Sequence, residues 1–160
     1  MSKKIGILFD LDGTLLDTLQ DLTDATNYAL RKFSLPERSV SYIRSILGNG
    51  AQRQIALAMP GKADDPGVEQ VLAVYKEYYA DHCQIKTRPY DGVVSAMEEL
   101  SKKYPLAVVS NKPHFAVKPL CETISPVFIV AAKVRSAPES QRRIWYIDVW
   151  KTWAWTLVYL

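Results

Sequence analysis

A short apolar segment near the start of the chain runs directly into two acidic residues. Residues 5–9 read Ile-Gly-Ile-Leu-Phe, and Asp10 and Asp12 follow them. An apolar run of this length with β-branched residues is typical of a buried strand in a parallel sheet. Because ligands of open α/β sheets bind outside the carboxyl ends of the strands, the sequence predicts a ligand site at these two acids.

The residue types after this strand suit the transfer of a phosphoryl group. Two acids at positions i and i+2 leave the strand on the same side, so one can attack phosphorus while the other exchanges a proton with the leaving group. Gly13 permits a tight turn, and Thr14 offers its hydroxyl and its backbone N–H to phosphoryl oxygens. Carboxylates repel phosphate, so a divalent cation is expected, and Mg²⁺ suits a site of oxygen ligands.

Helical patterns and one more strand account for the chain up to residue 122. Apolar residues recur with helical spacing over about 17–33, 39–47, 51–58, 67–83 and 90–103, and Pro113 opens a further helix. Either Asp17 or Thr18 can cap the first of these helices. Leu106–Ser110 reads as a second buried strand, whereas the span from about 16 to 84 reads as helix and turn throughout. The pattern predicts an α/β fold with a helical region inserted after the first strand.

The segment FDLDGTLLD, from Phe9 to Asp17, resembles the first motif of the haloacid dehalogenase superfamily, DxDGT followed by Leu or Val. The resemblance implies a Rossmann-like core in which Asp10 is the nucleophile that forms an aspartyl-phosphate. It also implies that Asp12 is the general acid and base, and that the Asp10 carboxylate and the Asp12 backbone carbonyl bind Mg²⁺. The presence of Asp12 argues against a true dehalogenase, in which the second acid is not expected.

The segment Ser110-Asn111-Lys112 resembles a second motif of that superfamily, in which a hydrophobic strand ends in Ser or Thr. A hydroxyl and an amide at the end of a strand can hold phosphoryl oxygens beside the nucleophile. The continuation into Pro113 is similar to the phosphoglycolate phosphatase branch in particular.

The inserted helices resemble the small helical cap of the same superfamily. Gly48, Asn49 and Gly50, together with Arg53, are similar to the specificity loop of that cap, where the arginine would bind a substrate carboxylate. A plain helix–helix turn with a surface arginine is the alternative interpretation. The expected domains are a partial core of residues 1–15 and 86–122, a helical cap of residues 16–85, and an aberrant tail of residues 123–160.

The tail departs in composition from everything before it. All four tryptophans lie within it, and all seven glycines lie before it. The resemblance implies a later lysine that neutralises the nucleophile and further acidic Mg²⁺ ligands, but Lys133 and Lys151 have the wrong surroundings and Asp148 stands alone. A one-base shift of the reading frame near Glu122 accounts for this, because the other frame permits the expected KPAPD segment. We therefore interpret the tail as frameshifted and truncated, and expect impaired activity.

These motifs predict an enzyme, a Mg²⁺-dependent phosphomonoester hydrolase of the phosphoglycolate phosphatase type that acts on a small phosphorylated metabolite. One alternative is a sugar-phosphate mutase of the same superfamily, similar to beta-phosphoglucomutase. The other alternative is a catalytically inactive fragment.

The amino-acid composition argues against some classes of binding partner. Lys and Arg number 20 against 17 Asp and Glu without forming a basic stripe, so no nucleic acid is expected. No run approaches the roughly 18 apolar residues of a membrane span, and the run before Asp10 is shorter than a secretory leader requires. Two cysteines, Cys83 and Cys121, are too few for a disulfide framework. The protein is predicted to be cytoplasmic, with its oligomeric state left open.

Overall fold

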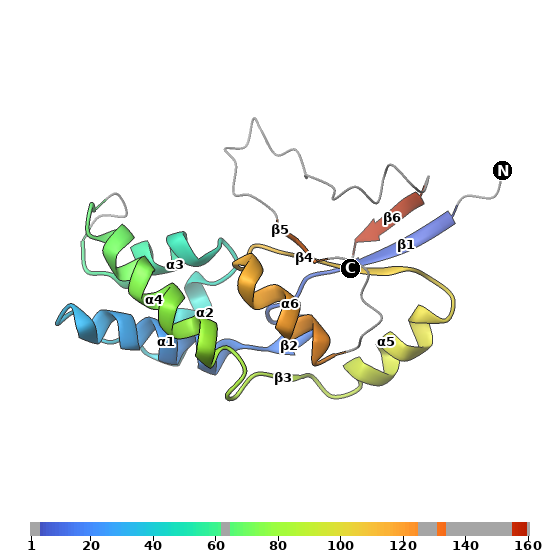
Figure 1. The fold of residues 1–160 in the computed structure, drawn as a ribbon, viewed down its shortest axis with the longest axis horizontal. Helices are drawn as coiled ribbons and strands as arrows, with labels where there is room; N and C mark the ends of the chain where they lie inside the picture. The colour runs from blue at the N-terminus through green and yellow to red at the C-terminus, as the bar shows by residue number, and fades with distance from the viewer. Residues whose placement is uncertain (1–3, 62–64, 125–130, 134–154, 160) are drawn as a thin grey trace. The chain divides into compact units, whose positions relative to one another are not determined.

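The chain crosses twice between two structural units. The computed structural model describes residues 4–61, 65–124, 131–133 and 155–159 (Figure 1). One unit is formed by Asp17–Arg88, and the other by the residues up to Leu16 together with those from Pro89 onward. No helix in the described part of the chain is long and apolar enough to cross a membrane.

A parallel sheet forms the centre of the discontinuous unit. Its strands are β1 (Lys4–Phe9), β4 (Leu106–Ser110), β5 (Ala131–Lys133) and β6 (Trp155–Tyr159), in the spatial order β5-β4-β1-β6. Every neighbouring pair is parallel. The helix α5 (Val93–Ser101) contacts β4, and α6 (His114–Glu122) contacts β5. The predicted α/β class, a parallel sheet with flanking helices, is confirmed.

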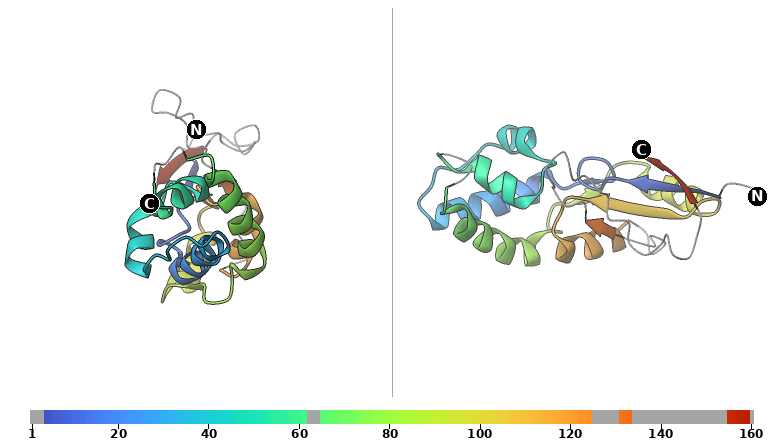
Figure 2. Two further views of the ribbon diagram at one scale, coloured as in Figure 1. Left: turned by 90° about the vertical axis from the view of Figure 1, so that its left-hand side faces the viewer. Right: turned by 90° about the horizontal axis from the view of Figure 1, so that it is seen from above.

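The register of the two central strands determines where the candidate site lies. Ile7 pairs with Leu106 and Phe9 pairs with Val108, so the two strands end beside each other (Figure 2). The strands and α6 bury an apolar core that includes Ile7, Leu8, Phe9, Leu106, Val108, Ala116, Val117 and Leu120. The apolar residues that predicted these strands are therefore the ones that the fold buries.

Two of the four strands come from the segment 123–160, for which the sequence predicts no element. β6 pairs with β1 from Lys4↔Trp155 to Leu8↔Tyr159, and β5 pairs with β4 from Val108↔Ala131 to Ser110↔Lys133. Strand pairing uses main-chain N–H and C=O groups, which nearly every residue type carries. The residues of β6, Trp-Thr-Leu-Val-Tyr, are moreover aromatic and β-branched types that favour strands.

Four helices build the other unit: α1 (Leu19–Lys32), α2 (Val40–Ile46), α3 (Ala51–Ala58) and α4 (Val68–His82). The buried residues Leu22, Ala25, Ala29 and Leu30 form one face of α1, which packs along α4 (Figure 1, Figure 2). A buried hydrogen bond of 2.8 Å from the Gln54 side-chain amide to the Thr26 hydroxyl joins α3 to α1. The helices predicted over this span are confirmed.

One very short strand, β2 (Leu16–Asp17), falls within the span of about 16 to 84 that the sequence predicts as helix and turn only, and its partner β3 (Arg88–Pro89) follows that span. The two strands pair with each other where the chain passes between the units. The prediction is wrong here because two residues are too few to show the alternation that marks a strand. Of the two candidate caps of α1, Asp17 is the one used: its carboxylate accepts the Leu19 N–H at 3.3 Å, whereas the Thr18 side chain makes no cap hydrogen bond.

Helix α1 is followed by a serine in the left-handed backbone conformation. Ser34 has φ of 56°, and the N–H of Leu35 donates to the Leu30 carbonyl at 3.0 Å, which closes the helix end. Because glycine adopts this conformation without steric cost, Ser34→Gly should raise the free energy of unfolding by about 0.5 kcal/mol. Urea denaturation measures the change. The matched control Ser45→Gly, inside α2, should lower the free energy of unfolding by about 0.5 kcal/mol; equal losses in both variants would contradict the argument.

The thiol of Cys121 in α6 should be unreactive in the folded protein. Burial, followed by the charge of Glu122, raises the pKa of Cys121 from 9.0 to about 11. At pH 8 only a very small fraction is thiolate, so alkylation by iodoacetamide should be about a hundredfold slower than in urea. Mass spectrometry of a Cys83→Ser variant, which leaves one thiol, gives both rates. Equal rates in buffer and in urea would refute the shift.

Candidate active site at the ends of β1 and β4

The loop after β1 is closed by its own main chain. Leu11 is fully buried, and its carbonyl accepts the N–H groups of Thr14, Leu15 and Leu16 at 3.4, 3.1 and 3.0 Å. Gly13 has φ of 79° and donates its N–H to the Leu16 carbonyl at 2.9 Å. The compact turn predicted for this glycine is therefore present.

This closure changes what the loop can offer to a phosphate. Gly13 and Thr14 are both exposed, but their N–H groups donate to carbonyls inside the loop. In this conformation the hydroxyl of Thr14 is the group it can present, while the part of its N–H in binding a phosphoryl oxygen stays a prediction. The space around Gly13 is open, with nothing within 4 Å of an added Cβ, so a ligand can approach the main chain there.

Lys112 joins the end of β4 to the loop after β1. Its Nζ lies 2.7 Å from Oδ1 of Asp12, and its side chain is only 2% exposed, against 23% for Asp12. The N–H of Lys112 donates to the hydroxyl of Ser110 at 3.2 Å, and Ser110 is itself buried. The structure thus brings Asp12, Ser110 and Lys112 together, with Asn111 between the last two in the chain.

The electrostatics of Asp10 show that it belongs to the same cluster. Burial raises the pKa of Asp10 above its ordinary value, while a hydrogen bond from the Leu11 N–H lowers it. The charge of Asp12 raises this pKa further, and the charge of Lys112 lowers it. Lys112 therefore supplies positive charge beside both carboxylates.

Sequence reasoning assigned Lys112 to phosphoryl oxygens and did not foresee its contact with Asp12. The signal was available, because parallel neighbouring strands end at the same sheet edge and Lys112 follows β4 as Asp12 follows β1. Lys151 and Asp148 lie outside the described residues.

The residues of the predicted specificity loop belong to the helical unit. Gly48, Asn49 and Gly50 connect α2 to α3, and Gly48 and Gly50 have φ of 102° and 82°. Arg53 lies exposed in the first half of α3. The structure places them in a different unit from Asp10, so their part in a common site stays a prediction.

The oxygen donors that Asp10 and Asp12 offer are of the chemical kind that Mg²⁺ prefers. Among the described residues no group of three His, Cys, Asp or Glu side chains is placed to hold a metal ion. The Asp10 carboxylate and the Asp12 main-chain carbonyl are hard oxygen donors, and Mg²⁺ is commonly held by one or two carboxylates with waters and substrate phosphate. The residues present therefore fit this cation better than one that requires a nitrogen or sulfur cage.

Residues 7–124 match the family model of the haloacid dehalogenase-like hydrolases. The chain belongs to this family. The resemblance seen in the acidic loop is thereby confirmed, and the matched region contains the second half of β1, the whole of β4 and the whole helical unit. Several relatives of this haloacid dehalogenase-like chain are named as phosphatases.

Phosphoglycolate phosphatase 1 of Pseudomonas aeruginosa is 35% identical over 122 residues, covering 72% of this chain and 44% of that protein. N-acetylmuramic acid 6-phosphate phosphatase of the same organism is 32% identical over 120 residues, covering 74% and 53%. A crystal structure of a predicted phosphoglycolate phosphatase from Haemophilus somnus 129pt superposes with a TM-score of 0.73 at 30% identity, covering 87% of this chain and 66% of that one. The chain spans about half the length of the curated relatives it matches.

The Lys112–Asp12 pair should stabilise this haloacid dehalogenase-like fold as a unit. Asp12→Asn would leave a buried ammonium without this carboxylate, so it should lower the free energy of unfolding by about 2–4 kcal/mol. Lys112→Met should lower the free energy of unfolding by less, because the Asp12 carboxylate that it leaves without this partner is partly exposed to water. Urea denaturation of both variants and of the double variant gives the coupling energy, expected to exceed about 1 kcal/mol. Strictly additive losses would show that the pair contributes nothing.

Proposed function

We propose that this chain is a phosphomonoester hydrolase that acts through an aspartyl-phosphate on Asp10. The observation that carries the proposal is the Lys112–Asp12 ion pair of 2.7 Å at the shared ends of β1 and β4, with Asp10 in the same electrostatic cluster. A nucleophilic carboxylate, a proton-exchanging carboxylate and a fixed cation are the groups that phosphoryl transfer requires. The relatives named as phosphatases support the same reaction class.

Each residue has a distinct part in the proposed reaction. An oxygen of Asp10 attacks phosphorus, and the ester oxygen leaves with a proton from Asp12, which enters this step as the neutral acid and ends it as the carboxylate that pairs with Lys112. Asp12 then accepts a proton from the water that hydrolyses the aspartyl-phosphate, which releases phosphate and restores Asp10. The pair with Lys112 fixes the Asp12 side chain for both steps, because a buried ammonium at 2.7 Å restrains it.

Phosphoryl oxygens would be bound by side chains around this centre: Thr14 through its hydroxyl, Ser110, Asn111 and Lys112. Mg²⁺, held by the Asp10 carboxylate and the Asp12 main-chain carbonyl, would offset the negative charge of the phosphate. Since burial already raises the pKa of Asp10, added positive charge there would favour its ionised, nucleophilic form.

The substrate class follows from the relatives and from the helical unit. Phosphoglycolate carries a carboxylate besides its phosphate, and Arg53 beside the Gly48–Gly50 turn would bind that group bidentately. The named relative that acts on a sugar phosphate leaves a second class open. A small phosphorylated metabolite is therefore the proposed substrate.

Hydrolysis of p-nitrophenyl phosphate and of 2-phosphoglycolate with Mg²⁺ tests the proposal. Asp10→Asn keeps the shape of the side chain and removes its nucleophilic oxygen, so turnover should fall by about a thousandfold or more. The surface substitution Glu37→Gln is the control and should leave turnover unchanged, because Glu37 pairs with Arg31 on the exposed face of the helical unit. Chelation by EDTA should abolish turnover, and added Mg²⁺ should restore it.

Other outcomes identify the alternatives. Equal background turnover in the unaltered chain and in Asp10→Asn would refute the proposal and favour a catalytically inactive chain. Transfer of the phosphoryl group to a sugar hydroxyl in place of release as inorganic phosphate would identify a mutase. Turnover that responds to Asp10→Asn but stays far below that of a full-length relative would agree with the impairment expected from the tail.

A further inference from the structure

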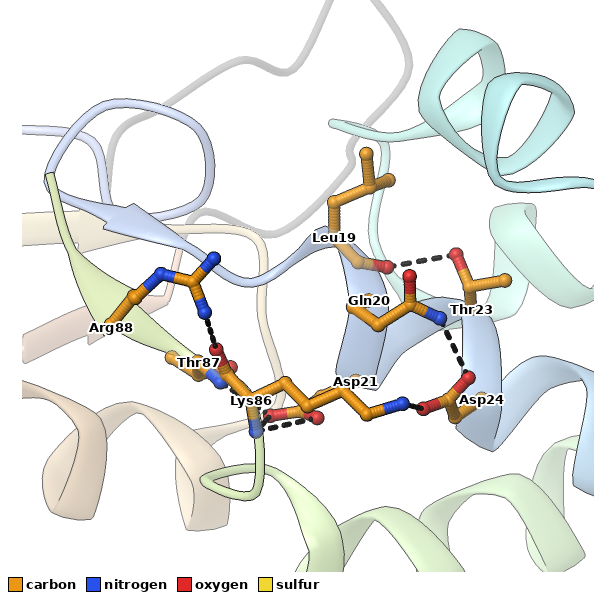
Figure 3. Close-up of polar contacts among 8 residues, drawn as sticks. All are labelled: Leu19, Gln20, Asp21, Thr23, Asp24, Lys86, Thr87 and Arg88. Atoms are coloured by element: carbon orange, nitrogen blue, oxygen red, sulfur yellow. Dashed lines mark hydrogen bonds and ion pairs between the residues drawn. The ribbon is translucent and has the colours of Figure 1, made fainter.

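A single buried carboxylate fastens the two ends of the helical unit to each other. Asp21, in the first turn of α1, is only 3% exposed. Its two oxygens accept the N–H of Lys86 at 2.9 Å each, and Oδ2 accepts the N–H of Thr87 at 2.8 Å (Figure 3). Lys86 and Thr87 directly precede β3, through which the chain leaves the unit. We call these three residues the root clasp.

The contacts around the root clasp are weaker because water reaches them. Lys86 Nζ lies 2.7 Å from Oδ2 of Asp24, but the two side chains are 50% and 39% exposed, so this ion pair contributes little. Arg88 donates to the Lys86 carbonyl at 3.1 Å, also at an exposed position. The buried, charge-assisted bonds of Asp21 are the ones that can hold the segment.

The position of Asp21 also reduces the free-energy cost of burying its negative charge. It lies near the amino end of α1, where the aligned peptide dipoles stabilise a negative charge. The preceding Asp17 accepts the Leu19 N–H at 3.3 Å, so the start of the helix is itself fixed. The clasp therefore connects the return segment to a rigid element.

A second tie lies on the other side of the crossing. In the discontinuous unit, the N–H of Tyr90 donates to the Leu15 carbonyl at 3.2 Å. The outgoing and returning segments are thus joined on both sides of β2 and β3. Only these two-residue strands and the residues next to them lie between the two ties.

We propose that the root clasp makes the helical unit a closed body, in which Asp21 holds the first turn of α1 and the segment that follows α4 together. Asp21 and Lys86 are 65 positions apart. The packing of α1 on α4 already brings the two helices together, and the clasp adds a buried tie between α1 and the residues that follow α4. With it, the segment that follows α4 stays bound to α1. The inference does not depend on catalysis by Asp10.

Hydrogen exchange on the unaltered full chain gives the first test. Lys86 and Thr87 lie outside every helix and strand, where amides ordinarily exchange at close to unprotected rates. The root clasp predicts that these two amides exchange at least about tenfold more slowly than in an unstructured peptide of the same sequence. Exchange at the unprotected rate would overturn the proposal, whatever the chain does as an enzyme.

Limited trypsin digestion of variants gives the second test. Asp21→Asn replaces one acceptor oxygen with a donor that faces the same N–H groups, so cleavage after Lys86 should accelerate about tenfold or more. The following Arg88–Pro89 bond resists trypsin, which keeps the product simple. The matched control Asp24→Asn, one turn later on α1, removes the exposed ion pair with Lys86 and keeps a side-chain oxygen that can accept from Gln20, so it should change the rate by no more than about twofold.

Two results would overturn the clasp: cleavage of Asp21→Asn at the rate of the unaltered chain, or equal acceleration in Asp24→Asn. Circular dichroism of each variant shows whether its helices persist. If Asp21→Asn loses them, the exchange measurement on the unaltered chain decides. Phosphatase activity enters neither test, so failure of the proposed function and failure of the clasp are separate results.

Discussion

The parallel pairing of β1 with β4 is the constraint on which the candidate site depends. Phe9 opposite Val108 fixes the ends of both strands at one edge of the sheet. The two loops that follow then bring Asp12 and Lys112 within 2.7 Å although they are 100 positions apart. A shift of this register would separate the ammonium from both carboxylates and leave Lys112 buried without that partner.

Much of this arrangement could be predicted from the sequence, because the elements that matter are long or strongly patterned. The apolar strand before Asp10, the strand before Ser110 and the periodicity of α1 and α4 each have one physical explanation. The acidic loop was assigned correctly as a tight turn, since a residue with φ of 79° at Gly13 requires glycine.

The parts that could not be predicted depend on contacts between distant residues or on very short elements. β2 and β3 have two residues each, and no periodicity exists at that length. The bonds from Asp21 to Lys86 and Thr87 leave no trace in local sequence, because a carboxylate in a first helical turn looks like an ordinary favourable charge. The direction of the Thr14 N–H depended on how Leu11 packs, which only the fold determines.

β6 has a consequence for how such a chain tolerates change at its end. The strand binds the edge of β1 from Lys4 to Leu8 through the main chain, which has the same hydrogen-bonding groups at almost every residue type. An open sheet edge therefore acts as an acceptor for almost any extended segment of adequate length. Substitutions in β6 that keep an extended main chain should therefore leave its pairing with β1 in place.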